Sequence, residues 1–197
     1  MTRTHEVERR AGTPVGRLLP VLGDYRRAWL SGDVVAGLTL AAVAMRREYH
    51  PKDIVLSRVD EHWKARPADP GAETEPGLII YRFEAELFFA NADYFAARLQ
   101  DLVSNAPHPV RWVVLDLVSL DDIDYTGGLL LASTVSRLQQ AGITIALAET
   151  DAVRGDLERY GITQRVGASC IFDTVQAAVA AFHTAAGRAS PRAAPAA

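Results

Sequence analysis

The fold of this chain is decided by the stretch Asp121-Asp122-Ile123-Asp124-Tyr125-Thr126-Gly127-Gly128. It follows an apolar, strand-like run from Val110 to Val118 and precedes a helical pattern that begins at Leu129. We interpret it as an acidic loop between a strand and a helix. The first N–H groups of a helix have no partner within it, and the two glycines should leave them unshielded. We therefore expect Thr126 at an exposed helix entrance, where its hydroxyl oxygen can cap a free N–H group.

Length and composition bound the class of protein. The 197 residues suffice for one domain with appendages, and 49% hydrophobic with 23% charged residues is typical of a globular chain. A net charge of −3 provides no general attraction to nucleic acid, so no nucleic-acid partner is expected. The single cysteine, Cys170, excludes an internal disulfide and favours a reducing compartment. We expect it to be a small buried side chain.

Residues 1–52 differ from the rest and are interpreted as an irregular, basic leader. Arginines alternate with Pro and Gly residues through its first 32 positions, a composition that breaks long helices. The charge-free run from Val34 to Met45 follows. As a helix it would span about 18 Å, whereas the hydrocarbon core of a membrane is about 30 Å thick. We therefore expect at most a peripheral membrane contact, by a short helix lying on the surface, and no cleaved secretory signal.

Strands and helices alternate between residues 53 and 183, which should fold alone, whereas the Ala- and Pro-rich tail, residues 184–197, should be disordered. The alternation predicts an α/β fold with a mixed central sheet and helices packed on it. Strands are expected at Asp53 to Val59, Leu78 to Phe83, Val110 to Leu117 and Ile143 to Leu147, with an extended segment at Ala85 to Ala90 and a loop at Asp60 to Gly77. Helices are expected after Asn91, from Leu129 to Gln140 with Gly142 at the end, from Asp151 to Gly161, and from Asp173 or Thr174.

Motifs for catalysis or cofactor binding are missing from the sequence. The five histidines lack metal-ligand spacing, and there is neither a phosphate-cradling Gly-rich loop nor a nucleophile elbow. Asp121, Asp122 and Asp124 have two interpretations: a divalent-ion or acid–base site, or a turn that complements the positive end of a helix. We favour the turn, because nothing else in the chain completes a site. We therefore expect no enzyme activity, no metal and no cofactor.

Four segments carry a resemblance to a known family. The segments Pro76–Phe83, Leu87–Ala92, Arg111–Asp116 and Asp122–Gly127 closely resemble the STAS domain at the cytoplasmic carboxyl end of SulP-type (sulfate permease) anion transporters. The resemblance covers about residues 53–183. It implies a single STAS-like α/β domain, a cytoplasmic location and kinship with the bacterial anti-sigma-factor antagonists.

The same resemblance implies a function for the loop. In the antagonists, the last Ser or Thr before the glycine of this loop is phosphorylated by a partner kinase, and the loop and the following helix contact that partner. By position, Thr126 is then the regulatory phosphoacceptor. Tyr125 departs from the small Ser or Thr that is common at its position. The implied interaction loop comprises Asp122, Asp124, Tyr125, Gly127 and Gly128.

A second resemblance lies in the leader. The segment Leu19–Thr39 is similar to the amino-terminal entry of SulP transporters into their first membrane helix. In that family many membrane helices separate this entry from the STAS domain, whereas here Met45 is followed at once by Arg46 and Arg47. The chain therefore resembles a transporter whose transport domain is deleted.

Three functional hypotheses remain open at this point. The first is a regulatory module that acts through the Asp124 to Gly128 loop on a transporter or a regulatory protein. The second is a subunit or truncated remnant of a SulP sulfate/anion transporter, associated with the inner face of the plasma membrane. One short apolar run cannot build a transport path by itself, which opposes autonomous transport. The third is a nucleotide-binding module, since the resemblance implies that some STAS domains bind nucleotides, but the aspartates beside the helix start repel phosphate.

Overall fold

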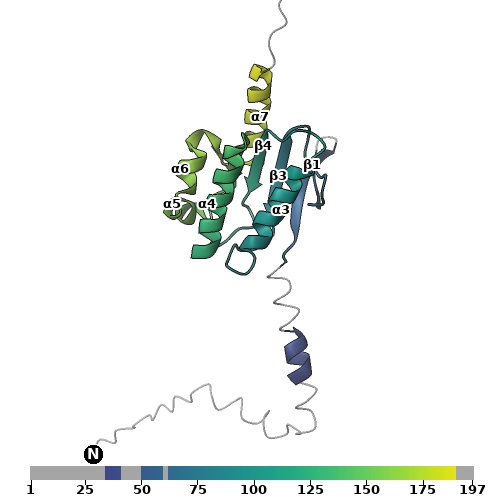
Figure 1. Ribbon diagram of the computed structural model, residues 1–197, viewed down its shortest axis with the longest axis vertical. Coiled ribbons are helices and arrows are strands. Elements are labelled where there is room, and N and C mark those ends of the chain that lie inside the picture. Colours follow the sequence, from purple (N-terminus) through teal and green to yellow (C-terminus); the bar gives the residue numbers. More distant parts are fainter. Residues whose placement is uncertain (1–33, 41–49, 60–61, 190–197) are drawn as a thin grey trace, which may run out of the picture. The chain divides into compact units, whose positions relative to one another are not determined.

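A six-stranded mixed sheet organises the chain from residue 53 onwards (Figure 1). The computed structural model describes residues 34–40, 50–59 and 62–189. The strand order is β2-β1-β3-β4-β5-β6, and β1 pairs antiparallel with both of its neighbours while the remaining pairs are parallel. The strands are β1 (Asp53–Val59), β2 (His62–Pro67), β3 (Leu78–Phe83), β4 (Trp112–Asp116), β5 (Thr144–Ala148) and β6 (Ile171–Phe172).

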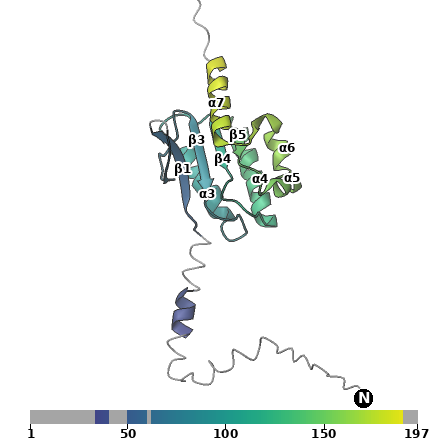
Figure 2. The ribbon, with the colours of Figure 1, turned by 180° about the vertical axis from the view of Figure 1, so that it is seen from behind.

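Helices cover both faces of this sheet (Figures 1 and 2). On one face lie α3 (Ala92–Ser104) and α4 (Tyr125–Gln140), and on the other lies α7 (Val175–Ala189). The connection from β5 to β6 contains α5 (Arg154–Arg159), α6 (Ile162–Val166) and the short 3₁₀ helix η3 (Ala168–Cys170). The predicted α/β fold with a mixed sheet is confirmed.

Strand side chains alternate between the two helical layers. In β4, Val113 and Leu115 pack with the residues of α3 and α4, whereas Val114 packs with those of α7. A strand that is covered on both faces needs apolar residues at every position, which explains the continuous apolar runs in the sequence. The buried residues of α3 include Phe95, Leu99 and Leu102, whose spacing places them on one face of the helix.

The prediction of a loop from Asp60 to Gly77 was wrong, because that range contains β2. This strand pairs antiparallel with β1, and His62 lies opposite Val59. Five of its six residues are exposed. An edge strand that buries so little has no apolar alternation, and Pro67 and the charged residues reinforced the appearance of a loop.

Two predicted helix starts also differ from the structure. Asp151 does not cap α5, which begins at Arg154; its carboxylate instead accepts a hydrogen bond from the Arg154 guanidinium at 2.9 Å. Asn91 does precede α3, but its side chain makes no cap hydrogen bond. Its Oδ1 accepts from the Phe88 N–H at 3.1 Å, and its Nδ2 donates to the Glu86 carbonyl at 2.9 Å. The amide therefore fixes the loop before the helix.

Among the other predicted features, some agree with the structure and others differ from it. Gly142 has the expected left-handed backbone, with φ of 82°, and Thr174 accepts a hydrogen bond from the Ala177 N–H at the start of α7. The last helix continues past residue 183 to Ala189. Cys170, expected to be buried, is partly exposed and packs against both hydrophobic clusters. The short elements α6 and β6 had not been expected.

An ion pair with a buried tyrosine joins β1, β3 and α3. The Arg98 guanidinium donates to both Asp53 carboxylate oxygens, at 2.8 and 3.3 Å, and also to the Ala68 carbonyl. The Tyr81 hydroxyl donates to Asp53 at 3.1 Å. Burial, reinforced by the negative charge of Asp53, raises the pKa of Tyr81, so the phenol stays protonated and remains a donor. These bonds hold the middle of α3 against the sheet.

The described part of the leader is a helix at residues 34–40, within a separate unit, Met1–Ala44. Its apolar side chains Val34, Val35, Leu38 and Leu40 are exposed. None of the helices in the described ranges is long and apolar enough to cross a membrane. Residues 1–33 and 41–49 of the predicted leader lie outside the described residues, as do the tail from residue 190 and the end of the apolar run.

Candidate functional site

The acidic loop is joined to the segment that precedes α3. Leu87 and Ile123 form a parallel β-bridge. The Leu87 N–H donates to the Asp122 carbonyl at 3.1 Å, and the Asp124 N–H donates to the Leu87 carbonyl at 3.0 Å. An extended segment was expected at Ala85 to Ala90, but within the described ranges Leu87 is the only one of these residues that makes a β-bridge. The bridge fixes the starts of α3 and α4 beside each other.

Asp124 is the N-cap of α4. Its Oδ1 accepts a hydrogen bond from the Gly127 N–H at 2.7 Å, and its backbone carbonyl accepts one from the Gly128 N–H at 2.9 Å. Its Oδ2 accepts from the Phe89 N–H at 2.9 Å. The helix thus begins at Tyr125 rather than Leu129, and the prediction that Thr126 caps it was wrong. A carboxylate accepts several N–H groups at once and complements the helix dipole, so aspartate is the stronger cap.

The two glycines of the loop permit close packing and do not open the helix end. A Cβ atom on Gly127 would lie 2.9 Å from the Leu87 carbonyl carbon and closer still to its oxygen. A Cβ atom on Gly128 would overlap the ring of Tyr160. That tyrosine also donates to the Ile123 carbonyl at 3.4 Å. Both glycines are buried within α4, and they allow Leu87 of the segment before α3 and Tyr160 at the end of α5 to approach the helix.

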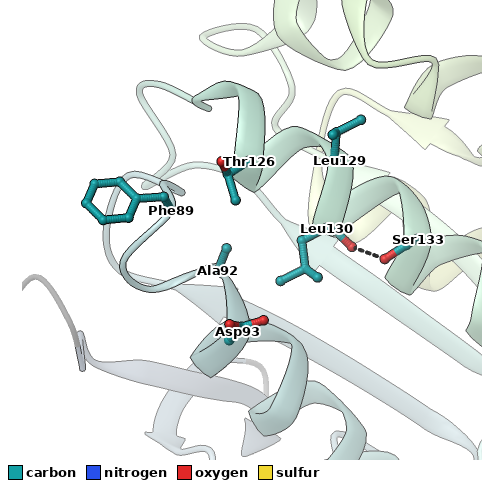
Figure 3. Close-up of a pocket in the computed structure, with 7 residues that line it drawn as sticks. All are labelled: Phe89, Ala92, Asp93, Thr126, Leu129, Leu130 and Ser133. Carbon is teal, nitrogen blue, oxygen red and sulfur yellow. Dashed lines mark hydrogen bonds between the residues drawn. The ribbon is translucent and has the colours of Figure 1, made fainter.

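Thr126 is the second residue of α4 and is exposed. Among the described residues its hydroxyl has no hydrogen-bond partner. It lines a groove of about 290 Å³ between the starts of α3 and α4 (Figure 3). The other lining residues are Phe89, Ala92, Asp93, Leu129, Leu130 and Ser133. Thr126 therefore presents an exposed hydroxyl group that makes no hydrogen bond with the described part of the fold.

The remaining residues of the predicted interaction loop are exposed. Tyr125 is 69% exposed, and its ring meets that of Tyr160 edge to face with centroids 6.4 Å apart. Asp121 and Asp122 face solvent, and Asp122 accepts a hydrogen bond from the Ile123 N–H at 2.9 Å. Across the described ranges, no three His, Cys, Asp or Glu side chains converge as metal ligands. The aspartates act here as turn and cap residues.

A nucleotide phosphate finds little to bind at this helix start. The Asp124 carboxylate already accepts the N–H group of Gly127, one of those that a phosphate would otherwise contact. Asp93 and Asp122 add negative charge beside them. The geometry therefore disfavours the nucleotide hypothesis at this position.

An ion pair between β3 and the end of β4 fixes the direction in which the chain leaves the sheet. The Arg82 guanidinium donates to Asp116 Oδ2 through Nε at 2.9 Å and through a terminal nitrogen at 2.6 Å. The Asp116 side chain is fully buried, and its Oδ1 accepts from the Val118 N–H at 3.2 Å. The aspartate therefore sets the direction of the chain after β4.

Phe89 is the site residue that the sequence analysis did not identify. It is 66% exposed, its backbone is held by Asp124, and its side chain lines the groove. The available signal was a second phenylalanine directly after Phe88 in a segment expected to be extended. Alternation would have placed one of the two rings outside, but only the fold shows that this ring lies beside Thr126.

Substitution of the cap residue Asp124 is expected to reduce the stability of the domain moderately. We expect Asp124→Ala to lower the free energy of unfolding by about 1–2 kcal/mol, because the N–H groups of Gly127 and Phe89 lose their acceptor. Asp124→Asn retains an acceptor for one of them and should lose about half as much. Urea unfolding measures both. An equal loss from Asp121→Ala, which removes an exposed carboxylate, would contradict the capping role.

Comparison with known proteins identifies similarities over most of the described chain. The STAS domain family profile matches residues 69–178. A probable sulfate transporter of Mycobacterium tuberculosis is 36% identical over 152 residues, which cover 73% of this chain and 27% of that protein. Sulfate transporter 3.1 of Arabidopsis thaliana is 23% identical over 167 residues, covering 76% of this chain and 25% of that protein. The chain thus spans about a quarter of the length of these relatives.

Solved structures show the same fold. The murine Solute Carrier 26 family member A9 anion transporter matches with a TM-score of 0.61 at 20% identity, over 77% of this chain and 25% of that one. A sulfate transporter family protein from Wolinella succinogenes matches with a TM-score of 0.50 at 22% identity, over 60% of this chain and 98% of that one. At these identities the likeness concerns the fold alone.

Proposed function

Because the chain belongs to the STAS domain family and is homologous to sulfate transporters, we propose that it is a regulatory protein-interaction module. Its contact surface is the Asp124 to Gly128 loop with the start of α4, and its partner is a transporter or a regulatory protein. Thr126 is the phosphoacceptor that controls this contact. The observation that carries the proposal is the exposed Thr126 hydroxyl, which the fold does not use.

The different roles of Asp124, which caps α4, and Thr126, whose hydroxyl is not needed for the cap, support a regulatory switch at Thr126. Asp124 caps α4, so a phosphate on Thr126 would remove no hydrogen bond that the folded domain needs. The positive helix terminus favours the added charge, whereas Asp93 and Asp122 oppose it. The modification would therefore leave the fold intact and change the electrostatics of the exposed surface.

The relatives support a second candidate function, which is connected with sulfate transport. They are described as sulfate transporters, and this chain covers about a quarter of their length. A second candidate function is therefore that of a subunit or truncated remnant of a sulfate/anion transporter. In either role the domain would lie in the cytoplasm, associated with the inner face of the plasma membrane.

Substitution at Thr126 tests the switch. We expect Thr126→Asp in the full chain to change partner recovery at least about threefold in pull-downs from the membrane and soluble fractions of its own cells, because it adds permanent charge to the contact surface. Thr126→Ser keeps the hydroxyl and should recover partners as the unmodified sequence does. Circular dichroism should show an unchanged fold for both variants.

A matched control lies on another helix. Thr163 is the second residue of α6, as Thr126 is of α4, so Thr163→Asp adds the same charge at the same helical position. It should leave recovery unchanged. Equal recovery by Thr126→Asp and Thr126→Ser would contradict the proposal, as would an equal change caused by Thr163→Asp.

A further inference from the structure

Exposed large apolar side chains gather around one end of the domain. Among the side chains described from residue 50 onwards, the four that are large, apolar and exposed are Phe89, Val118, Tyr125 and Leu129. All four lie in or beside the two segments that lead into α3 and α4. The rest of this domain keeps such residues inside. A local concentration of exposed apolar surface indicates a contact region for another molecule, and two of the four residues, Phe89 and Leu129, line the groove.

The groove gives that surface a definite shape. Leu130 of α4 and Ala92 of α3 lie across it from each other, and Phe89 and Leu129 stand at its margins (Figure 3). Phe89 is 66% and Leu129 49% exposed, so much of their surface is free to be covered. A volume of about 290 Å³ accommodates a few apolar side chains rather than a whole domain.

The two segments that form the groove carry charge of one sign. The segments 84–97 and 117–136, which form its two walls and the loops before them, contain no Lys, Arg or His. Asp93 lines the groove itself, and Thr126 adds a second negative group when it is phosphorylated. The acidic residues of the two segments are Glu84, Glu86, Asp93, Asp121, Asp122 and Asp124.

We propose that this groove binds a cationic amphipathic segment of a partner protein, with its apolar side chains between α3 and α4 and its Lys or Arg side chains against the acidic rim. The inference rests on the proposed function, since it names the chemistry of the partner at the same surface. Apolar contacts supply the affinity. The acidic rim selects against acidic partners and speeds association with basic ones. Nucleic acids and anionic lipids are repelled by the same rim.

Two synthetic helical peptides of equal length test the partner chemistry: an amphipathic peptide of leucine and lysine, and its counterpart of leucine and glutamate. Each carries a fluorescent label and is titrated with the full chain, and its anisotropy is recorded. We expect the lysine peptide to bind at least about tenfold more tightly, and its advantage to shrink as salt is raised. Equal affinity for the two peptides would overturn the proposal.

Matched variants test whether binding takes place in the groove. Leu129→Ser and Val118→Ser remove side chains of nearly equal exposure, 49% and 50%, of which only Leu129 lines the groove. We expect Leu129→Ser to weaken the lysine peptide about tenfold and Val118→Ser to have little effect. Asp93→Asn should weaken it about threefold, whereas Asp101→Asn, at the other end of α3, should not. Equal effects within the first pair would show that the groove is not the binding site, and equal effects within the second would show general attraction to an acidic protein; either result would overturn the proposal.

The two proposals fail in different ways. Thr126→Asp should strengthen binding of the lysine peptide about twofold to threefold. If it does not, while the Leu129 and Asp93 variants behave as expected, the groove stands and the switch at Thr126 fails. If the two peptides bind equally, while Thr126→Asp still changes recovery of the native partner, the switch stands and the cationic partner is wrong.

Discussion

Replacing Gly127 by alanine is expected to lower the free energy of unfolding by about 3 kcal/mol or more. The new Cβ atom would lie 2.9 Å from the Leu87 carbonyl carbon and closer still to its oxygen. Leu87 cannot move away easily, because its carbonyl accepts the Asp124 N–H and its backbone forms the bridge to Ile123. The substitution should therefore separate α4 from the loop before α3. Urea unfolding measures the loss.

Gly155 provides the control for this substitution. It also lies within a helix, α5, but no atom comes within 4 Å of its would-be Cβ atom. Gly155→Ala should therefore stabilise the protein by about 0.5–1 kcal/mol, because alanine has the lower entropic cost of folding. A similar effect of both substitutions would show that Gly127 matters only through its conformational freedom, and would contradict the close-packing account.

The second large effect is expected at the ion pair between Arg82 and Asp116. Arg82→Met should lower the free energy of unfolding by about 3 kcal/mol, because the fully buried Asp116 carboxylate loses its only described ion-pair partner. Urea unfolding measures the loss.

A double variant separates charge burial from lost packing. Arg82→Met with Asp116→Asn removes both charges, yet the asparagine Oδ1 can still accept the Val118 N–H. It should lose only about 1 kcal/mol. If the double variant is as unstable as Arg82→Met alone, the arginine stabilises the sheet by packing and not by neutralising Asp116.

The sequence predicted those parts of the fold whose own residues carry the signal. The strands in the middle of the sheet are continuous apolar runs because both faces are covered, and Leu99 and its neighbours mark the buried side of α3. The strand His62–Pro67 was missed because it lies at the edge and buries little. Its composition resembles that of a loop, and only its pairing with β1 makes it a strand.

The local structure of the acidic loop was predicted only in part. The acidic loop and Thr126 were identified, yet the cap was assigned to Thr126 instead of Asp124. Gly127 and Gly128 were expected to leave the first N–H groups of the helix unshielded. Their actual role is contact with Leu87 and Tyr160, residues 40 and 32 positions away along the chain. Such contacts leave no local pattern, which is also why the groove was not predicted.

The phosphorylation state of Thr126 in the native cell tests the central claim most directly. The full chain would be isolated from cells grown with abundant and with scarce sulfate, and its peptides mapped by mass spectrometry. We expect phosphate on Thr126 in a fraction of the molecules under at least one condition, and none on Thr163, which occupies the same position in α6. Complete absence of phosphate from Thr126 under both conditions would contradict the account and leave the loop as a contact surface without a switch.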